Sequence, residues 1–192
     1  EGKSFELNLN GKTISAINSI SDKNNDGKLT SADNVVFIDV RGNLTVKNGT
    51  MTLKHTGDNY GWNACTELFY VAGNGVLNIE DATIENLGGS DMAYVVDMVN
   101  ATNITVNVAN STLKSTYIPF RVFNNGSGMN NVTINNSTLE GVSRAFWVHI
   151  YSNVDTKGNG VKSSTLNLDI FGNGNTFIAS NPNRIIEFGY DN

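Results

Sequence analysis

The sequence predicts an all-β chain that folds as a single-stranded parallel β-helix of about six coils. The first observation is a corner motif, in which Gly, Asn or Asp is followed two places later by Thr and then by an apolar residue. Only residue types that tolerate the left-handed backbone conformation fill its first position. The second observation is the spacing of the copies, roughly 26 to 38 residues, which is typical of repeat architectures. The copies begin at Gly11, Asn48, Asp81, Asn110, Asn136 and Gly174.

A strand is expected on each side of every corner. Two apolar residues with strand spacing precede the corner, and period-two alternation turns both side chains toward the inside of the coil. These pairs are Leu7/Leu9, Leu44/Val46, Leu77/Ile79, Ile104/Val106, Val132/Ile134 and Leu166/Leu168. In four copies the apolar residue after the Thr lies five places beyond the second of the pair and would face outward on a straight strand, so the chain must turn at the corner to bring it back inside. The fourth and sixth copies carry insertions before the corner.

A third family of apolar segments lies between the corners and predicts one further strand in each coil. The expected strands are 35–40, 68–71, 94–99, 118–123, 146–151 and 185–188. Each coil therefore has a strand before the corner, a strand after it and a third strand reached through a variable loop.

Composition limits the class of protein. The net charge of −5 argues against nucleic acid and anionic membrane surfaces as partners. No run of 18 apolar residues occurs, so no membrane insertion is expected. Cys65 is the only cysteine, which excludes an internal disulfide and indicates a small buried apolar residue. We expect residues 1–192 to form a single domain, a fragment of a longer surface protein.

Residues 22–33 match the 12-residue calcium loop of EF-hands. The predicted oxygen ligands are Asp22, Asn24, Asp26, the carbonyl of Lys28, Thr30 and Asp33. Gly27 would supply the sharp turn at loop position 6. Since the segment that follows reads as a strand, no exiting helix is expected, and one Ca²⁺ would stiffen an insertion in the first coil. The alternative is an ordinary Asp-Gly turn in a polar loop.

The outward positions of the third strand family form one column when the apolar residues are aligned. The column reads Asp39, Tyr70, Asp97, Arg121, His149 and Glu187. Apolar columns are expected beside it: Phe37, Leu68, Val95, Pro119, Trp147 and Ile185 on one side, Phe123 and Tyr151 on the other. A polar row within an apolar strip is typical of a binding groove. The expected ligand contacts are Tyr70, Phe123, Trp147 and Tyr151.

A structural interpretation of this column stays open beside the binding groove. Charges of alternating sign in adjacent coils form favourable cross-strand pairs of about 0.2–1 kcal/mol each. The apolar strip could also be covered by the loop at 54–66 or by a neighbouring domain.

The chain resembles the right-handed parallel β-helices of the pectin-lyase-like superfamily along its whole length. The segments that carry the resemblance are 7–14 and 44–50. Their residue pattern is similar to that of surface and secreted proteins of gut bacteria. The calcium loop, with Asp33 in last place, resembles a dockerin loop. The superfamily builds its chemistry on the strand that follows the variable loop, where the outward column would lie. The Gly-His-Gly and Arg-x-Lys motifs of polygalacturonase-like hydrolases are absent.

The sequence leaves three alternative functions for this chain. The first is a non-catalytic extracellular or cell-surface module of a bacterium that contacts a polysaccharide or other glycan. The second is a polysaccharide lyase or glycoside hydrolase, with Arg121 or His149 as base and Asp97 or Glu187 as acid or cation ligand. The third is a structural spacer or adhesin stalk attached to other domains of a larger surface protein.

Overall fold

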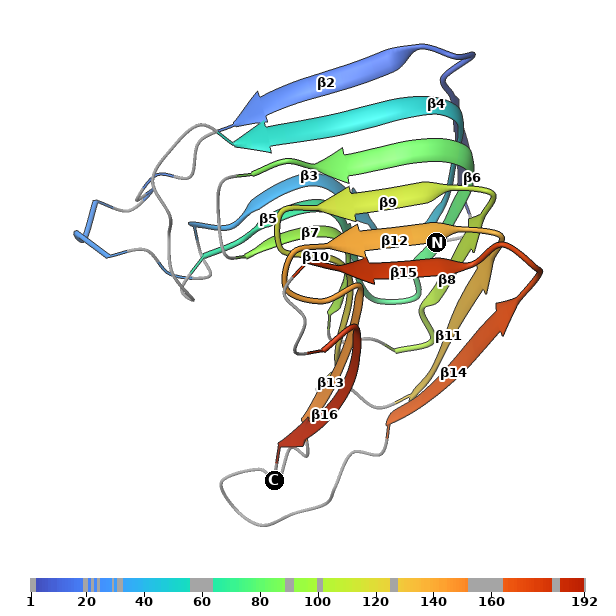
Figure 1. The fold of residues 1–192 in the computed structure, drawn as a ribbon. Helices are drawn as coiled ribbons and strands as arrows, with labels where there is room; N and C mark the ends of the chain where they lie inside the picture. Colours follow the sequence, from blue (N-terminus) through green and yellow to red (C-terminus); the bar gives the residue numbers. More distant parts are fainter. Residues whose placement is uncertain are drawn as a thin grey trace.

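The computed structural model describes residues 3–18, 21, 23, 25–28, 30, 33–55, 64–88, 92–99, 102–124, 128–151, 164–180 and 184–191. Within these ranges the chain is all-β, and its strands form two parallel sheets (Figure 1). The described residues include no helix of the length and apolar character that crossing a membrane requires.

The larger sheet has ten strands, lies on both sides of the corners and curls into a half-barrel. Its strands are β1 (Ser4–Asn8), β2 (Thr13–Asn18), β4 (Asn43–His55), β6 (Val76–Asn86), β8 (Thr105–Ala109), β9 (Thr112–Ser115), β11 (Gly128–Asn135), β12 (Thr138–Gly141), β14 (Ser164–Phe171) and β15 (Thr176–Ala179). We call it the curled sheet. In β4 and β6 one continuous strand runs through the corner.

The smaller sheet has six strands in the order β16-β13-β10-β7-β5-β3. Its strands are β3 (Val35–Val40), β5 (Thr66–Val71), β7 (Ala93–Val99), β10 (Ile118–Asn124), β13 (Phe146–Tyr151) and β16 (Ile186–Asp191). We call it the six-stranded sheet. The third strand family of the sequence forms this sheet.

Each strand pairs in parallel with its equivalent one repeat further along the chain. Leu44 pairs with Leu77, and Leu77 pairs with Val106, so equivalent apolar residues lie in one row. In Figure 1 the strands β2, β4, β6, β9, β12 and β15 lie one beneath another. This register is compatible with a β-solenoid, as the repeat spacing predicts.

The corners have the left-handed backbone that their residue types predict. The angle φ is +59° at Asn48, +50° at Asp81, +49° at Asn110 and +47° at Asn136. At the last copy the left-handed residue is Gly172, with φ +88°, and not Gly174. Asn and Asp tolerate this conformation better than other residues with a Cβ atom, so the chain turns there at little conformational cost.

Side chains of one corner bind the backbone of the preceding corner. Ser111 Oγ accepts a hydrogen bond from Ala82 N (3.1 Å), Ser137 Oγ accepts one from Ser111 N (3.1 Å), and Asn175 Oδ1 accepts one from Ser137 N (3.0 Å). Backbone N–H groups that the turn would leave buried without a partner are therefore satisfied from one coil to the next.

The core lies between the two sheets. The residues that follow the corner threonines point inward, and Met51, Ile84 and Leu113 are at most 1% exposed. Other inward columns end in exposed side chains: Phe5, in the column of Leu44, is 63% exposed, and Phe188, in the column of Val148, is 65% exposed. Burial of the apolar columns between successive coils thus supplies the main stabilisation.

Two residues of the predicted outward apolar column point into the core instead. Leu68 and Val95 are both 0% exposed and belong to the core cluster, as do their neighbours Phe69 and Val96. The pairing of β5 with β7 joins Glu67 to Tyr94 and Phe69 to Val96. Leu68 and Val95, which lie between these positions, are not paired. The strands bend here, so two successive side chains face inward and the period-two rule, which placed Leu68 and Val95 outside, is wrong at this point.

Candidate functional site

The outer face of the six-stranded sheet carries the outward column, but its register differs from the expected one at one position. Arg121 pairs with Asp97 on one side and with Trp147 on the other, and Trp147 pairs with Glu187. His149 pairs with Phe123 instead, one row away. The alignment that placed His149 in the column is wrong by two residues, a slip that keeps the side chain on the same face and that alternation cannot detect.

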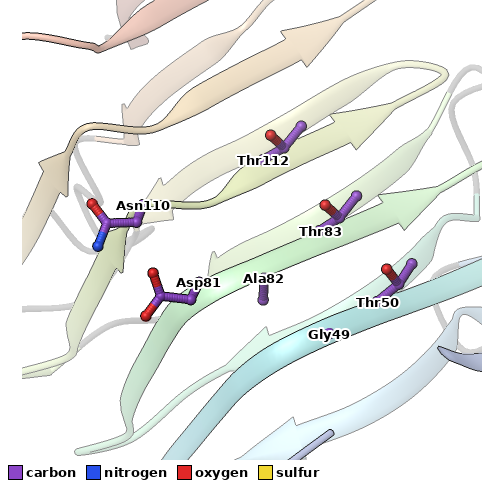
Figure 2. A pocket seen from close by; sticks show the side chains of 7 residues that line it. All are labelled: Gly49, Thr50, Asp81, Ala82, Thr83, Asn110 and Thr112. Atoms are coloured by element: carbon purple, nitrogen blue, oxygen red, sulfur yellow. The ribbon is translucent and has the colours of Figure 1, made fainter. Parts of the chain in front are cut away.

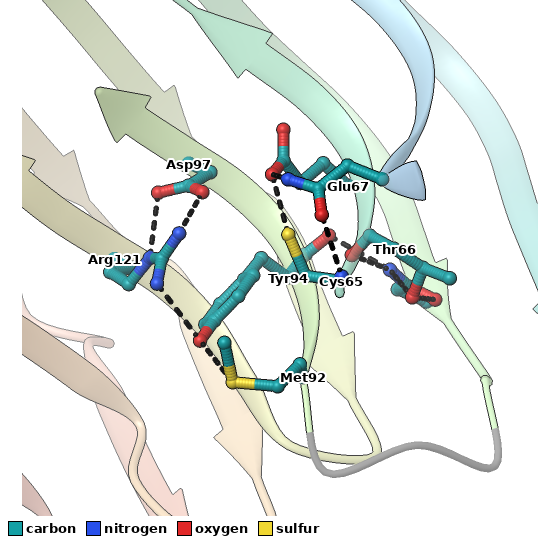
Figure 3. A network of polar contacts seen from close by, with 9 residues as sticks. Cys65, Thr66, Glu67, Met92, Tyr94, Asp97 and Arg121 are labelled. Carbon is teal, nitrogen blue, oxygen red and sulfur yellow. Dashed lines mark hydrogen bonds and ion pairs between the residues drawn. The ribbon is translucent and has the colours of Figure 1, made fainter. Parts of the chain in front are cut away.

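Asp97 and Arg121 form a buried ion pair on β7 and β10 (Figure 3). Arg121 Nε donates to Asp97 Oδ1 at 2.8 Å, Arg121 Nη2 donates to Asp97 Oδ2, and Nη1 donates to the Tyr94 hydroxyl at 3.1 Å. The guanidinium also lies over the rings of Tyr94 and Phe123, 3.9 and 4.7 Å from their centroids. Bidentate geometry and ring contacts hold this side chain in one orientation.

The electrostatics of the pair keep Arg121 charged. Burial alone would lower its pKa, but the Asp97 carboxylate and the Tyr94 hydroxyl raise the pKa of Arg121 above its ordinary value by a larger amount. The side chains of Asp97 and Arg121 are 0% and 9% exposed. A guanidinium that stays protonated and is covered by its partners is a poor general base.

Glu67 is a second buried carboxyl beside this pair, and no pattern in the sequence predicts its role. Its Oε1 accepts hydrogen bonds from Cys65 Sγ (2.7 Å) and Asn34 Nδ2 (3.3 Å), while Asn34 Oδ1 accepts one from Cys65 N (2.9 Å). Burial, and next the nearby Asp97 charge, raise the pKa of Glu67 to about 8. Burial also raises the pKa of the Cys65 thiol, so it is an unreactive apolar residue as predicted.

Half-exposed aromatic rings lie on the same face next to the ion pair. The Trp147 ring lies 5.1 Å from the ring of His149, and the Phe123 ring lies 5.7 Å from it in an edge-on arrangement. The guanidinium of Arg144 lies 5.0 Å from the centre of the Trp147 ring. We call Phe123, Trp147 and His149 the aromatic strip. Within the described part of the chain, the buried Trp147 Nε1 has no hydrogen-bond acceptor.

The remaining predicted contacts are spread along the face. Tyr70 is half-buried in the column beside Asp97. The side chain of Tyr151 lies outside the described residues. Glu187 binds Arg144 Nε and, at 2.8 Å, Arg184 Nη1. Burial acts to raise the pKa of Glu187, but the two guanidinium groups lower it below its ordinary value, so the carboxylate is ionised.

The predicted calcium loop is described only in part. Asp22 and Asn24 lie outside the described residues. Gly27 has φ +77°, as the sharp turn requires, and Asp26 Oδ1 accepts a hydrogen bond from Lys28 N at 2.8 Å. Among the described residues no group of three His, Cys, Asp or Glu could hold a metal ion.

Asp33 closes the loop as a fully buried carboxylate. Its Oδ1 accepts a hydrogen bond from Lys23 N (2.9 Å), and its Oδ2 accepts bonds from Thr30 N (2.8 Å) and Thr30 Oγ1 (3.2 Å). The backbone N–H of Lys23, and next that of Thr30, lower the pKa of Asp33. The carboxylate is therefore ionised, and its three hydrogen bonds tie the two ends of the loop together.

The charged groups described on the outer face of the six-stranded sheet are paired with one another, and the partly exposed groups beside them are the rings of the aromatic strip. No protein-family model, curated protein or solved structure matches this chain.

Proposed function

We propose that this chain is an extracellular or cell-surface module of a bacterial protein that contacts glycans without cleaving them. Its fold would be a single-stranded right-handed β-helix similar to those of the pectin-lyase-like superfamily. The coil-to-coil register and the repeated left-handed corners support the solenoid part of this proposal. Other domains of a longer surface protein would be its neighbours.

The charge network supports a role without catalysis. Arg121 is held protonated by Asp97, and Glu187 is bound by Arg144 and Arg184. His149 lies outside the column that contains Asp97 and Arg121. The acid and the base that a lyase or hydrolase would need are thus bound to other partners or separated by register.

The observation that carries glycan contact is the aromatic strip. Aromatic rings offer flat apolar faces of the kind that fits the C–H faces of sugar rings, and Tyr and Trp are common anchors in interfaces. The guanidinium of Arg144 beside the Trp147 ring carries N–H donors that could bind the hydroxyls of a sugar.

The test is retention of polysaccharides by the wild-type protein and by Trp147→Ala in affinity electrophoresis. The polysaccharide is set in the gel, and binding slows the migration of the protein. We expect the affinity of the protein for at least one glycan to fall by about tenfold or more when the indole is removed. Phe171→Ala is the matched control, because Phe171 is a 46% exposed aromatic residue on β14 in the curled sheet. Equal retention by both variants and the wild type would refute the aromatic strip as the contact surface.

A bound Ca²⁺ in the loop at 22–33 is a second part of the proposal. Asp26 and Asp33 would be ligands, and the ion would stabilise the folded chain by mass action. We expect saturable terbium binding and a melting temperature that falls in chelator. Asp26→Ala should remove both effects, and Asp169→Ala, at an exposed position of β14, should leave them intact. An unchanged melting temperature together with no saturable binding would contradict the calcium site.

A further inference from the structure

A polar groove lies at the corner of the curled sheet (Figure 2), whereas the aromatic strip belongs to the six-stranded sheet. It crosses β4, β6 and β9 and has a volume of about 400 Å³. Its lining residues are Gly49, Thr50, Asp81, Ala82, Thr83, Asn110 and Thr112. Since three coils contribute, its length is about 10 Å, two strand spacings.

The two walls of the groove follow from the corner motif. The left-handed position supplies Asp81 and Asn110 on one side, and the threonine two places later supplies the other side. Thr50, Thr83 and Thr112 are in ladder register with one another, so their hydroxyls recur at about 4.8 Å. In Figure 2 the three side chains share one orientation, with each oxygen on the side of Asp81 and Asn110.

The floor of the groove is low because its residues are small. A Cβ atom at Gly49 would lie 2.5 Å from Leu9 Cβ and 2.6 Å from the carbonyl oxygen of Lys12. Glycine is therefore required at this position by the close approach of the preceding coil. Ala82 is 5% exposed and adds only a methyl group.

The groups in the walls are available to a ligand. Within the described residues, the side chains of Asp81, Thr83 and Asn110 have no hydrogen-bond partner in the protein, whereas Asn78 on β6 and Asn107 on β8, both before the corner, bind each other at 2.8 Å. Asp81 is the single charge that lines the groove. An anionic ligand would be repelled by it, while a vicinal pair of hydroxyls could donate two hydrogen bonds to its carboxylate.

We infer that this corner groove is a second binding site, which takes a neutral sugar of about disaccharide length. The threonine hydroxyls and the Asn110 amide each donate and accept, as the hydroxyls of a sugar do. The threonine methyl groups provide apolar contact. A cation alone is a poorer match, because calcium requires six or more oxygen ligands and usually several carboxylates. The site is independent of the aromatic strip and of the function proposed for it.

The experiment is a titration of the ¹⁵N-labelled protein by NMR with cellobiose, xylobiose and mannobiose, and with digalacturonate as the anionic counterpart. The backbone amides of Gly49, Thr83 and Thr112 report on the groove, and the Trp147 indole reports on the aromatic strip. We expect at least one neutral disaccharide to shift the groove amides saturably, and digalacturonate to leave them in place. Trp147→Ala should not change this result.

Variants test the assignment without altering the fold. The triple variant Thr50→Val/Thr83→Val/Thr112→Val keeps the β-branched shape and removes three hydroxyls, and it should weaken binding by roughly three- to tenfold for each hydroxyl in use. The control Thr13→Val/Thr176→Val changes the same row outside the groove and should bind as the wild type does. Asp81→Asn keeps a residue that tolerates positive φ and should let digalacturonate bind.

Three outcomes would overturn the inference. One is the absence of any saturable shift of the groove amides with the neutral sugars. Another is equal affinity of the triple valine variant and the wild type. The third is a shift caused by calcium chloride and by none of the sugars, which would make Asp81 a cation contact.

Discussion

Removing one charge of the buried pair should destabilise the fold far more than removing a matched exposed charge. In Asp97→Asn the guanidinium of Arg121 stays buried but loses its counter-charge, and the amide can replace only one of the two acceptors. Breaking a buried ion pair from one side costs about 3–5 kcal/mol. Because the Tyr94 contacts remain, we expect a loss near 3 kcal/mol in the free energy of unfolding.

The matched control is Asp39→Asn. Asp39 lies in the same column and pairs with Arg41 at 2.9 Å, but the two side chains are 46% and 64% exposed. An exposed pair contributes about 0–1 kcal/mol, so the control should be near neutral. Both free energies of unfolding are measured by urea denaturation at one pH and one salt concentration.

A double replacement checks that the effect comes from the unpaired charge. In Asp97→Leu/Arg121→Met neither charge remains, and apolar side chains fill the space, so most of the lost stability should return. If Asp97→Asn loses less than about 1 kcal/mol, as the control does, the pair is not the desolvated element described here.

Three further predictions concern the corner, the buried acid and the core. Asn48→Ala should lower the free energy of unfolding by about 1–2 kcal/mol, since alanine disfavours the left-handed conformation. Asn48→Gly should not lower it. Urea denaturation measures the free energy of unfolding of both variants. The pKa of Glu67 is about 8 in the folded chain, above the ordinary value of 4.5 for a free glutamate, so the native state binds the extra proton and the stability should fall as the pH rises through this window. Glu67→Gln should flatten that fall in thermal melts, and an unchanged slope would contradict it. Ile84→Ala, at a 0% exposed position, should cost about 2–5 kcal/mol, whereas a melting temperature equal to that of the wild type would refute the assigned core.

The corner could be predicted from the sequence because its chemistry is local. A residue with positive φ needs Gly, Asn or Asp whatever its neighbours are, and the observed angles at Asn48, Asp81, Asn110 and Asn136 follow this rule. The alternating apolar pairs before each corner likewise determine which face is buried. The existence and the parallel pairing of the strands in the curled sheet were therefore accessible without coordinates. The register was only partly accessible. Leu7 pairs with Val46, Val106 with Leu77 and Leu168 with Val132, so the expected alignment of Leu7/Leu9, Ile104/Val106 and Leu166/Leu168 is wrong by two residues, a slip that alternation cannot detect.

The six-stranded sheet was less accessible because its side chains depend on contacts between coils. The bend at Leu68 and Val95 turns two successive residues inward, which no period-two pattern encodes. A shift of two residues leaves each side chain on its original face, so the sequence could not choose between Trp147 and His149 as the neighbour of Arg121. Glu67 could not be identified from the sequence, since its environment depends on Asn34 and Asp97, which lie in other coils.

The measurement that tests the central claim most directly is a combined assay of binding and cleavage. The protein is incubated with a panel of plant, host and microbial polysaccharides, with calcium and with chelator. Polymer length, unsaturated-uronate absorbance and retention on the polymer are read from the same samples. The account predicts retention by at least one glycan with no change in polymer length. Shortening of any polymer, or release of unsaturated uronate, would contradict it and make the Asp97–Arg121 column an active site.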